Sequence, residues 1–401
     1  EYWTVHLDSH KSRTKFSAKL TQFAGKKLEQ FDIPNEAEQS RILGLLAGND
    51  ASVASIEKKK KSRSPAAPFT TSTLQQEAVR KLGMTTDRTM RTAQQLYEGI
   101  DIGQGTVGLI TYMRTDSVAL ANEAVEEIRG YIGERFDAEH LPKNAVSYKN
   151  KSKNAQEAHE AIRPTSILRT PESVKPFLTT DQFKLYDMIW KRTLACQMAP
   201  AKFDTTSIDI HVGQGVFRAS GQVLVFAGFL SVYEEDVDDA EDEENAKLPL
   251  LTEGESLPVD KLYGEQHFTQ PPPRFSEASL VKALEEFGIG RPSTYASIIS
   301  TLKDREYVII DKKRFFPTDT GDIVNKFLTE HFAQYVDYNF TAKLENQLDE
   351  IASGSRQWVP VMDSFWKGFS KQITEKEGIS RAEVTTESLD EACPKCSKPL
   401  S

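Results

Sequence analysis

Two distant stretches of alternating apolar and polar residues constrain the fold of this chain more than any other feature. The first stretch covers residues 3–7 and 16–20, and the second covers residues 208–212, 216–226 and 229–233. Alternate side chains of a strand face opposite sides of a sheet, so each stretch predicts antiparallel strands. Because a lone pair of strands is only marginally stable in water, we expect both stretches to pair in one sheet, a β-rich arch.

Between these stretches lies a block whose apolar residues recur at helical spacing. Leu74, Ala78 and Leu82 form one such set, Met90, Ala93 and Tyr97 before Gly99 form a second, and residues 180–198 predict another helix. A chain of 401 residues is too long for one compact core. The sequence therefore predicts an α+β multidomain protein in which a helical lobe is inserted into the β-rich arch. The expected domains are residues 1–71, the first part of the arch; 72–200, the inserted lobe; 201–269, the second part of the arch with an acidic loop at 234–245; 270–380, a helical winged-helix-like domain; and 381–401, a linker with two cysteines.

The segment after three consecutive prolines at 271–273 has the pattern of a winged-helix domain. A helix ending at Gly288 is followed by a second helix beginning at Pro292–Ser293, and then by a hairpin around residues 311–313. Domains of this kind place a helix in a groove of DNA. One function class is therefore a winged-helix DNA-binding protein without catalytic chemistry. Such a protein would not need the pair of reactive side chains that occurs in the inserted lobe.

That pair is Tyr112 and Arg114, which lie two residues apart and thus on one face of an extended stretch. Residues 107–110 predict a short strand before the pair, and residues 115–117 predict the N-cap of a helix over residues 121–128. A phenol with a pKa of about 10 is a poor nucleophile, but a neighbouring guanidinium binds phosphate and stabilises negative charge on a reacting phenolate. The pair therefore predicts attack of Tyr112 on a phosphodiester. The alternative is an amphipathic tyrosine beside an ordinary surface charge.

Four ordered motifs resemble those of bacterial type IA DNA topoisomerases and favour the catalytic interpretation. Residues 112–117, with the sequence YMRTDS, are similar to the active-site signature of that family. Residues 157–165, with the sequence EAHEAIRPT, resemble the family's helix that faces the tyrosine. The stretches 274–305 and 340–349 resemble its third and fourth motifs. Together the motifs span most of the chain, which makes the resemblance specific.

The resemblance implies an enzyme that cleaves one DNA strand through a 5′-phosphotyrosine at Tyr112, passes a strand and religates. This transesterification relaxes negatively supercoiled DNA without ATP, and no nucleotide-binding GxxxxGK[ST] motif occurs in the chain. The resemblance also implies single-stranded and negatively supercoiled DNA as the partner, a monomer, and a cytoplasmic protein associated with the bacterial nucleoid. An alternative within the class is a topoisomerase III-like decatenase, although a cysteine pair near the end of the chain favours the relaxing enzyme.

Further site residues follow from the second and third motifs. His159 and Arg163 lie four residues apart, on one face of an expected helix that ends before Pro164. The resemblance implies that His159 lines the DNA path and takes part in proton transfer. The residues alone leave an alternative, in which His159 merely complements the helix dipole and Arg163 pairs with Glu160 or Glu157. The expected catalytic residues are Tyr112, Arg114 and His159, and the expected DNA-binding residues are Arg114, Arg163, Arg291, Ser293, Thr294 and Arg305.

The third motif places a cation and two hydroxyls at an expected helix N-terminus. Arg291, Ser293 and Thr294 would bind a phosphate there together with free N–H groups, although an ordinary N-cap by Ser293 explains the same pattern. Arg305 lies at the C-terminal end of that helix, where it would also complement the helix dipole. The resemblance implies that Arg291 and Arg305 contact the DNA backbone.

Charged residues are concentrated in two opposite runs. The net charge is −9, and residues 234–244 alone carry nine of the 59 acidic residues, in a run that we expect to form a solvated loop. The basic run 58–63 is expected to be a solvated turn before a helix that would lie near DNA. Asp236, Asp238 and Glu241 have the DxDxxE spacing of a Mg²⁺ triplet, but they lie within the acidic run without a buried strand before them. We therefore expect the Mg²⁺ ligands to lie outside this chain.

Three cysteines exclude a disulfide framework. Cys196 lies in an apolar helical run and is expected to be a core thiol. Cys393 and Cys396 form a CxxC half-site for Zn²⁺, and a tetrahedral structural site needs four ligands. We expect this site to be unfilled, the chain to be a fragment truncated at both ends, and the fragment alone to be inactive. No run of about 18 apolar residues predicts a membrane span.

Overall fold

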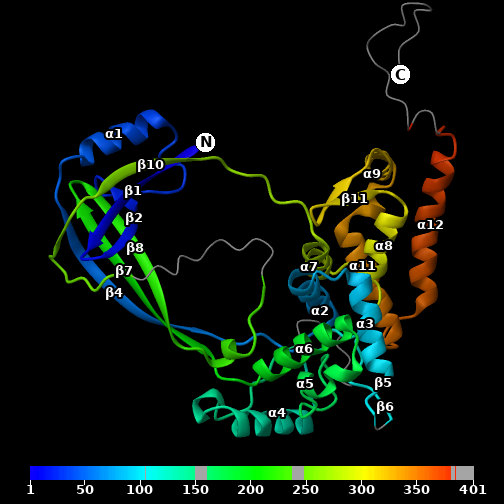
Figure 1. Ribbon diagram of the computed structural model, residues 1–401. Helices are drawn as coiled ribbons and strands as arrows, with labels where there is room; N and C mark the ends of the chain where they lie inside the picture. The colour runs from blue at the N-terminus through cyan, green and yellow to red at the C-terminus, as the bar shows by residue number, and fades with distance from the viewer. Residues whose placement is uncertain (104, 150–159, 237–247, 381–383, 385–401) are drawn as a thin grey trace, which may run out of the picture. The chain divides into compact units, whose positions relative to one another are not determined.

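The computed structural model of the chain contains two compact units, which we name the sheet unit and the helical unit. Figure 1 shows their helices and strands along the chain. The structure describes residues 1–103, 105–149, 160–236, 248–380 and 384.

The sheet unit is built on eight antiparallel strands, which include strands from both alternating stretches of the sequence. Their order is β10-β1-β2-β8-β7-β4-β9, with β3 beside β2. The first stretch therefore pairs directly with the second, between β2 and β8, which confirms the predicted sheet, whereas β4 lies outside both stretches and pairs with β7. The unit comprises residues 1–66, 129–146 and 194–273. Its strands are β1 (Tyr2–Lys11), β2 (Thr14–Phe23), β3 (Lys26–Lys27), β4 (Ala51–Arg63), β7 (Ala201–Val212), β8 (Gly215–Phe226), β9 (Ser256–Leu257) and β10 (Lys261–His267).

Helix α1 (Glu36–Leu46) covers one face of this sheet and closes its core. Leu7 of β1 and Leu46 of the helix are fully buried in one apolar cluster, because alternate residues of the strands face the helix. Gly264 of β10 faces the same helix, since a Cβ there would lie 2.1 Å from Gln39 Nε2. Its neighbours in β10 therefore point to the opposite, polar face of the sheet.

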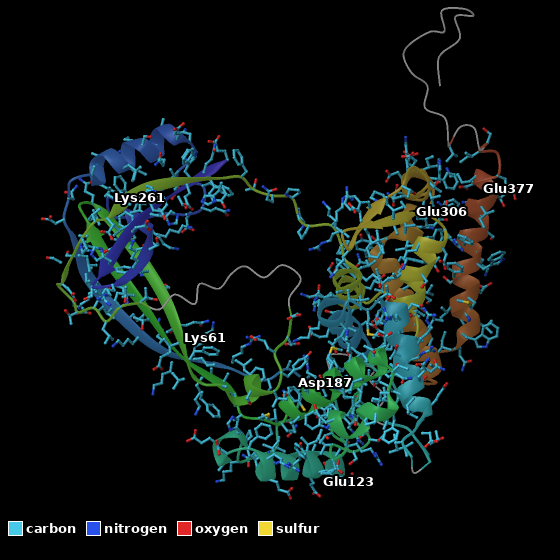
Figure 2. The ribbon with its side chains drawn as sticks, viewed as in Figure 1. Lys61, Glu123, Asp187, Lys261, Glu306 and Glu377 are labelled. Atoms are coloured by element: carbon cyan, nitrogen blue, oxygen red, sulfur yellow. The ribbon has the colours of Figure 1, made fainter. Side chains whose placement is uncertain are left out.

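Two expectations for the sheet unit are wrong. Residues 229–233 do not form a strand: a 3₁₀ turn over Gly228–Ser231 follows β8. Gly228 has a φ of +50° and a Cβ there would lie 2.3 Å from Ala199 O, so the chain must turn at this point. The basic run 58–63 is not a solvated turn but the exposed second half of β4, paired with β7. Lys61 in this half is labelled in Figure 2. β9 covers only the start of β4, and lysines on the remaining edge oppose pairing with another chain.

The helical unit comprises residues 67–128, 147–193 and 274–401. Glycines end two of its helices where the sequence predicts: α3 ends before Gly99, and α7 ends before Gly288, which has a φ of +71°. The predicted pattern of helix, helix and hairpin is present in α7, α8, β11 and β12. The elements are α2 (Thr71–Glu77), which continues as one π-helical turn (Ala78–Leu82), α3 (Thr86–Glu98), β5 (Ile100–Asp101), β6 (Thr106–Val107), α5 (Pro171–Val174), α6 (Thr180–Ala195), α7 (Glu277–Phe287), α8 (Tyr295–Asp304), β11 (Val308–Asp311), β12 (Arg314–Pro317), α9 (Asp319–His331), α10 (Ala333–Val336), α11 (Tyr338–Ala352) and α12 (Trp358–Lys376), with α4 (Asn122–Arg135) beginning in this unit.

Candidate active site

Tyr112 and Arg114 project from an extended segment whose alternate residues are buried. Met113, Thr115 and Ser117 are at most 3% exposed, whereas Tyr112 is 46% exposed and Arg114 is exposed as well. The predicted shared face of Tyr112 and Arg114 is therefore confirmed. Among the residues that the structure describes, no carboxylate forms an ion pair with Arg114, so its guanidinium is available to an anion.

Backbone hydrogen bonds hold this segment on both sides. The N–H of Leu109 donates to Leu96 O at 2.7 Å, and the N–H of Thr111 donates to Arg163 O at 2.9 Å. Ile110 also bridges Pro164, so the segment runs antiparallel to residues 162–165. The Tyr112 backbone is thus fixed by pairing with segments from elsewhere in the chain, although strand β6 itself covers only Thr106–Val107.

Thr71, the first residue of α2, fixes the segment on the far side of Tyr112. Its backbone N–H donates to Thr115 O at 2.9 Å, and its Oγ1 accepts the N–H of Thr115 at 2.8 Å. The same hydroxyl donates to Met113 O at 2.7 Å. Because Thr71 is fully buried, these three bonds are shielded from water and locate the backbone on both sides of Arg114.

Residues 115–117 of the signature do not cap a helix, contrary to the sequence prediction. Thr115 Oγ1 accepts the N–H of Ser117 at 3.0 Å, and Ser117 Oγ accepts the N–H of Ala119 at 3.1 Å, so these hydroxyls stabilise irregular turns. Helix α4 begins only at Asn122. Its first turn is capped by the Glu160 carboxylate, which accepts the N–H of Ala121 at 2.6 Å.

Tyr97, at the end of α3, contacts the Tyr112 ring. The two ring centroids are 5.3 Å apart with an interplanar angle of 65°, an edge-to-face contact. A Cβ at Gly108 would lie 2.7 Å from Tyr97 O, so this glycine allows the segment to approach α3 closely. The sequence places Tyr97 only in a helix before Gly99, and no local pattern indicates its contact with Tyr112.

The helix predicted for residues 157–163 is wrong where the structure describes it. Residues 160–165 are extended: the N–H of Ile162 donates to Phe69 O at 2.8 Å, and the N–H of Thr165 donates to Leu109 O at 3.0 Å. Pro164 disfavours helical backbone at Arg163, and the long-range bonds complete an extended conformation. His159 lies outside the described residues, so its role remains a prediction.

Arg163 is held by Glu160 rather than exposed. Its Nη2 and Nε lie 2.8 and 3.2 Å from Glu160 Oε2, and its Nη1 donates to Pro164 O at 3.0 Å. The side chain is only 15% exposed. This is the pairing that the sequence offered as the alternative to phosphate binding, and DNA binding by Arg163 stays a prediction.

The Arg291 motif lies at the start of α8, but the helix begins two residues later than Ser293. Thr294 is the N-cap by backbone position, and its Oγ1 accepts the N–H of Arg291 at 2.8 Å. The Arg291 side chain pairs with Asp349 of α11, with Nη2 at 2.6 Å from Oδ2. Arg305 is exposed at the C-terminal cap of α8, as predicted. The expected N-cap by Ser293 is therefore wrong, because Thr294 closes the turn before the helix.

Buried side chains connect the Tyr112 lobe with the α7–α8 motif inside the helical unit. Glu277 of α7 accepts bonds from the N–H and the Oγ1 of Thr86 at 2.7 and 2.9 Å, and lies 3.5 Å from Lys303 Nζ of α8. Burial raises the pKa of Tyr295 in α8 far above its usual range, and the nearby charge of Asp116 contributes to the increase. The signature around Tyr112 therefore lies close enough to α8 for their charges to interact.

Comparison with known proteins identifies the family. A family model described as DNA topoisomerase matches residues 1–363. This chain belongs to the bacterial type IA DNA topoisomerases. DNA topoisomerase 1 of Xylella fastidiosa strain Temecula1 is 52% identical over 386 residues, covering 94% of this chain and 47% of the relative. DNA topoisomerase 1 of Rickettsia felis is 50% identical over 388 residues, covering 96% and 50%. The full-length topoisomerase I structure from Thermotoga maritima superimposes with a TM-score of 0.77 at 32% identity, covering 99% of this chain and 62% of that one.

These matches confirm the predicted multidomain topoisomerase fold, and the relatives are named as topoisomerases, which are isomerases; they do not favour a non-catalytic winged-helix protein. The topoisomerase chain spans about half the length of the curated relatives it matches. None of its described helices is both long and apolar enough to cross a bilayer.

The predicted zinc half-site of this topoisomerase chain, Cys393 and Cys396, lies outside the described residues. So do Asp238 and Glu241 of the acidic triplet, which was not predicted to bind a metal. Asp236 is exposed and belongs to no helix or strand, which agrees with a loop rather than with a site behind a buried strand. Cys196 is buried, and it forms no disulfide with a described residue.

Proposed function

We propose that Tyr112 is the nucleophile with which the complete protein cleaves one strand of DNA. The observation that supports this most directly is an exposed phenol two residues from a guanidinium that forms no ion pair with any described residue, on a segment with a fixed backbone. A fixed backbone restricts where the Tyr112 oxygen can lie, and correct positioning of reacting groups supplies much of the rate of such reactions.

In the proposed reaction the Tyr112 oxygen attacks phosphorus and loses its proton. The tyrosine oxygen–phosphorus bond forms as the bond between phosphorus and the 3′-oxygen breaks, and the 3′-oxygen gains a proton. The products are a 5′-phosphotyrosine and a free 3′-hydroxyl. The new bond is again a phosphodiester, so its energy is retained and religation needs no ATP.

Arg114 would bind a nonbridging phosphate oxygen and stabilise the charge that develops during attack. Arg305 is exposed and suited to a neighbouring phosphate, whereas Arg291 and Arg163 would first have to give up Asp349 and Glu160. Ser293 and Thr294 would add hydroxyl contacts to the same strand. We propose His159 as a proton carrier near the leaving oxygen.

Mg²⁺ would assist the complete enzyme through carboxylates outside this chain. Within the described residues, the one group of three ligand-type side chains contains two imidazoles, a set that does not suit Mg²⁺. We propose that Zn²⁺ joins Cys393 and Cys396 when two further ligands are present. The partner would be single-stranded regions of negatively supercoiled DNA, bound by a monomer in the bacterial cytoplasm.

The test is replacement of Tyr112 by Phe in the complete protein. Only the nucleophilic oxygen is lost, so covalent protein–DNA adduct should disappear after denaturation while single-strand binding persists. Tyr97→Phe is the matched control, because it removes a hydroxyl from the contacting ring and should leave adduct formation intact. Adduct at normal yield in the Tyr112→Phe variant would refute the proposed chemistry.

A further inference from the structure

A second group of chemically reactive side chains lies on the sheet unit, on the polar face of β1 and β10. These two strands pair antiparallel, and β10 is an edge strand that pairs only with β1 among the described strands. Because Gly264 faces α1, its neighbours in β10 face the other way, together with every second residue of β1. The cross-strand pairs on this face are Tyr2 with His267, Thr4 with Glu265, and His6 with Tyr263.

Two imidazoles and one carboxylate converge at the middle pair. Glu265 Oε2 lies 3.6 Å from His6 Nε2 and 3.9 Å from His267 Nε2. Both Nε2 atoms lie 2.8 Å from Thr4 Oγ1, so they are directed to the same point. One ligand atom from each of the three side chains lies within 4.8 Å of the others.

The imidazole rings are held in these orientations by stacking. Tyr263 stacks on His6 with ring centroids 5.4 Å apart and an interplanar angle of 20°. Tyr2 stacks on His267 at 5.1 Å and 21°. Each histidine therefore lies against a tyrosine on the neighbouring strand, which reduces the rotamer entropy that a ligand would otherwise have to remove.

We propose that His6, Glu265 and His267 bind one Zn²⁺ or a divalent transition ion of similar preference. Zinc–ligand bonds of about 2.0–2.1 Å in a tetrahedron require ligand atoms roughly 3.4 Å apart. The observed separations exceed this by at most about 1.5 Å, which small side-chain rotations can close. Water would complete the coordination, and the Thr4 hydroxyl would lie beside it.

The alternative is a metal-free polar cluster. A hydroxyl can donate to one Nε2 and accept from the other if the two imidazoles are in opposite tautomers, and this needs no ion. Nearby charges do not decide between a bound metal and a metal-free cluster. Lys19 of β2 lies opposite His6 in the strand register, and its positive charge opposes a cation. Asp8 lies two residues further along β1, and its negative charge favours a cation. The ligand set itself is the argument for a metal, since imidazole with carboxylate suits Zn²⁺ better than Mg²⁺ or Ca²⁺.

A bound ion would join the edge strand to its neighbour. The ligands come from strands that lie about 260 residues apart in sequence, so binding would stabilise the folded sheet unit and not the unfolded chain. This site is separate from the proposed cleavage residues, all of which belong to the helical unit.

The experiment is a Zn²⁺ titration of the full chain by calorimetry, with Co²⁺ absorption as a second probe of coordination. All variants carry Cys393→Ser and Cys396→Ser, so that the CxxC half-site cannot contribute. We expect one equivalent to bind, and we expect His267→Ala and Glu265→Gln each to weaken binding at least about tenfold. Zn²⁺ should raise the melting temperature of the parent and not that of His267→Ala.

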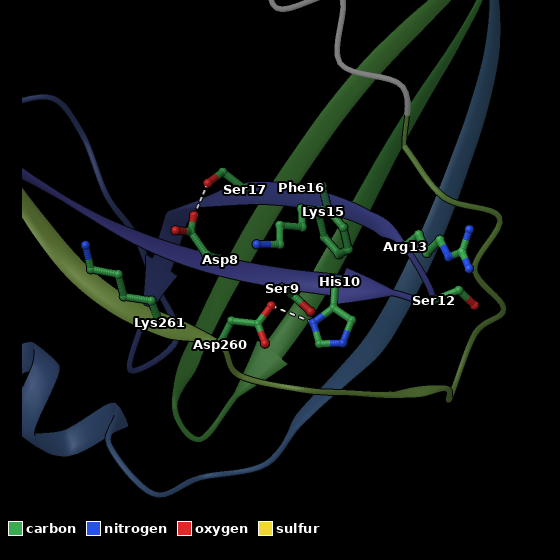
Figure 3. Close-up of a pocket in the computed structure, with 10 residues that line it drawn as sticks. All are labelled: Asp8, Ser9, His10, Ser12, Arg13, Lys15, Phe16, Ser17, Asp260 and Lys261. Atoms are coloured by element: carbon green, nitrogen blue, oxygen red, sulfur yellow. Dashed lines mark hydrogen bonds and ion pairs between the residues drawn. The ribbon is translucent and has the colours of Figure 1, made fainter.

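The matched control is His10→Ala. His10 lies on β1 as well, where its Nδ1 bonds Asp260 Oδ2 at 2.6 Å outside the proposed site, as Figure 3 shows. This variant should bind Zn²⁺ like the parent. Absence of saturable binding by the folded parent, unchanged affinity in Glu265→Gln, or an equal loss in His10→Ala would each overturn the proposal. Circular dichroism of each variant establishes that it is folded.

Discussion

Replacing Thr71 with Val tests whether a single hydroxyl positions the reactive segment. Val has nearly the same shape but can neither accept the N–H of Thr115 nor donate to Met113 O. The bond from the Thr71 N–H to Thr115 O is a backbone bond and is retained. The change therefore removes two defined hydrogen bonds next to Arg114 with little effect on packing.

The magnitude follows from burial. Thr115 is 2% exposed, so its N–H would lose its partner without gaining water, at a cost of about 1–3 kcal/mol. The lost bond to Met113 O adds about 1 kcal/mol. Opening of the segment should become easier by about 2–4 kcal/mol, which corresponds to roughly 30- to 700-fold faster amide exchange at Thr115.

Hydrogen exchange of the peptide containing residues 109–117 measures this opening directly. Peptides from β2 and β8 of the sheet unit should keep their exchange rates and serve as the internal control. In the complete protein, covalent adduct formation should fall by about tenfold or more, because Tyr112 and Arg114 would be held less firmly.

Thr71→Ser is the conservative variant, since it keeps the hydroxyl and loses one methyl group. It should restore slow exchange and most of the adduct yield. If Thr71→Val matches Thr71→Ser in both measurements, the hydroxyl does not position the segment, and the argument from fixed geometry fails.

Three other substitutions test separate parts of the structure. Arg114→Lys keeps the charge but loses the planar pair of donors, so relaxation of supercoiled DNA by the complete protein should fall about tenfold. A normal rate of relaxation would show that Arg114 is an ordinary surface charge. Glu160→Gln weakens the ion pair with Arg163 and so frees the guanidinium for a phosphate. Single-strand binding should then depend more on salt, with the slope of log K against log salt steeper by about 1. An unchanged slope would show that Arg163 does not reach phosphate. The hydrogen bond from Arg218 lowers the pKa of Asp209, so its stabilisation is present above the unfolded pKa and is lost as the pH falls below about 4. Asp209→Asn should reduce sheet-unit stability at pH 7 by about 1 kcal/mol or less and flatten its decline in acid, as followed by urea unfolding at several pH values.

Local sequence patterns predicted the elements whose cause is local. The alternation of apolar and polar residues predicted β1, β2, β7 and β8, because each of these strands buries one face against the same core. Gly99 and Gly288 predicted the ends of α3 and α7, because both glycines adopt positive φ values that do not continue a helix. The shared face of Tyr112 and Arg114 also follows from residue spacing alone.

The errors occur where distant segments supply the hydrogen bonds. Residues 160–165 contain good helix formers, but their backbone pairs with Phe69, Leu109 and Thr111, which are 50 or more residues away. Residues 115–117 look like a helix cap, yet Thr71 binds Thr115 and holds its backbone outside any helix. No local rule indicates either pairing. The proposed metal ligands were missed for the same reason, since only the register of β1 with β10 brings them together.

The position of Tyr112 therefore depends on several separate supports rather than on one helix or strand. Residues 162–165 hold the backbone before and at Thr111, Thr71 holds it after Met113, and the Tyr97 ring contacts the phenol itself. Because Tyr112 lies between the two backbone supports and Arg114 lies between the two residues that Thr71 binds, the two side chains should move together when the segment shifts. Their mutual geometry is then less sensitive to mutation than their distance from a phosphate bound elsewhere. Substitutions in the supports should consequently reduce the rate of cleavage without changing which bond is cut.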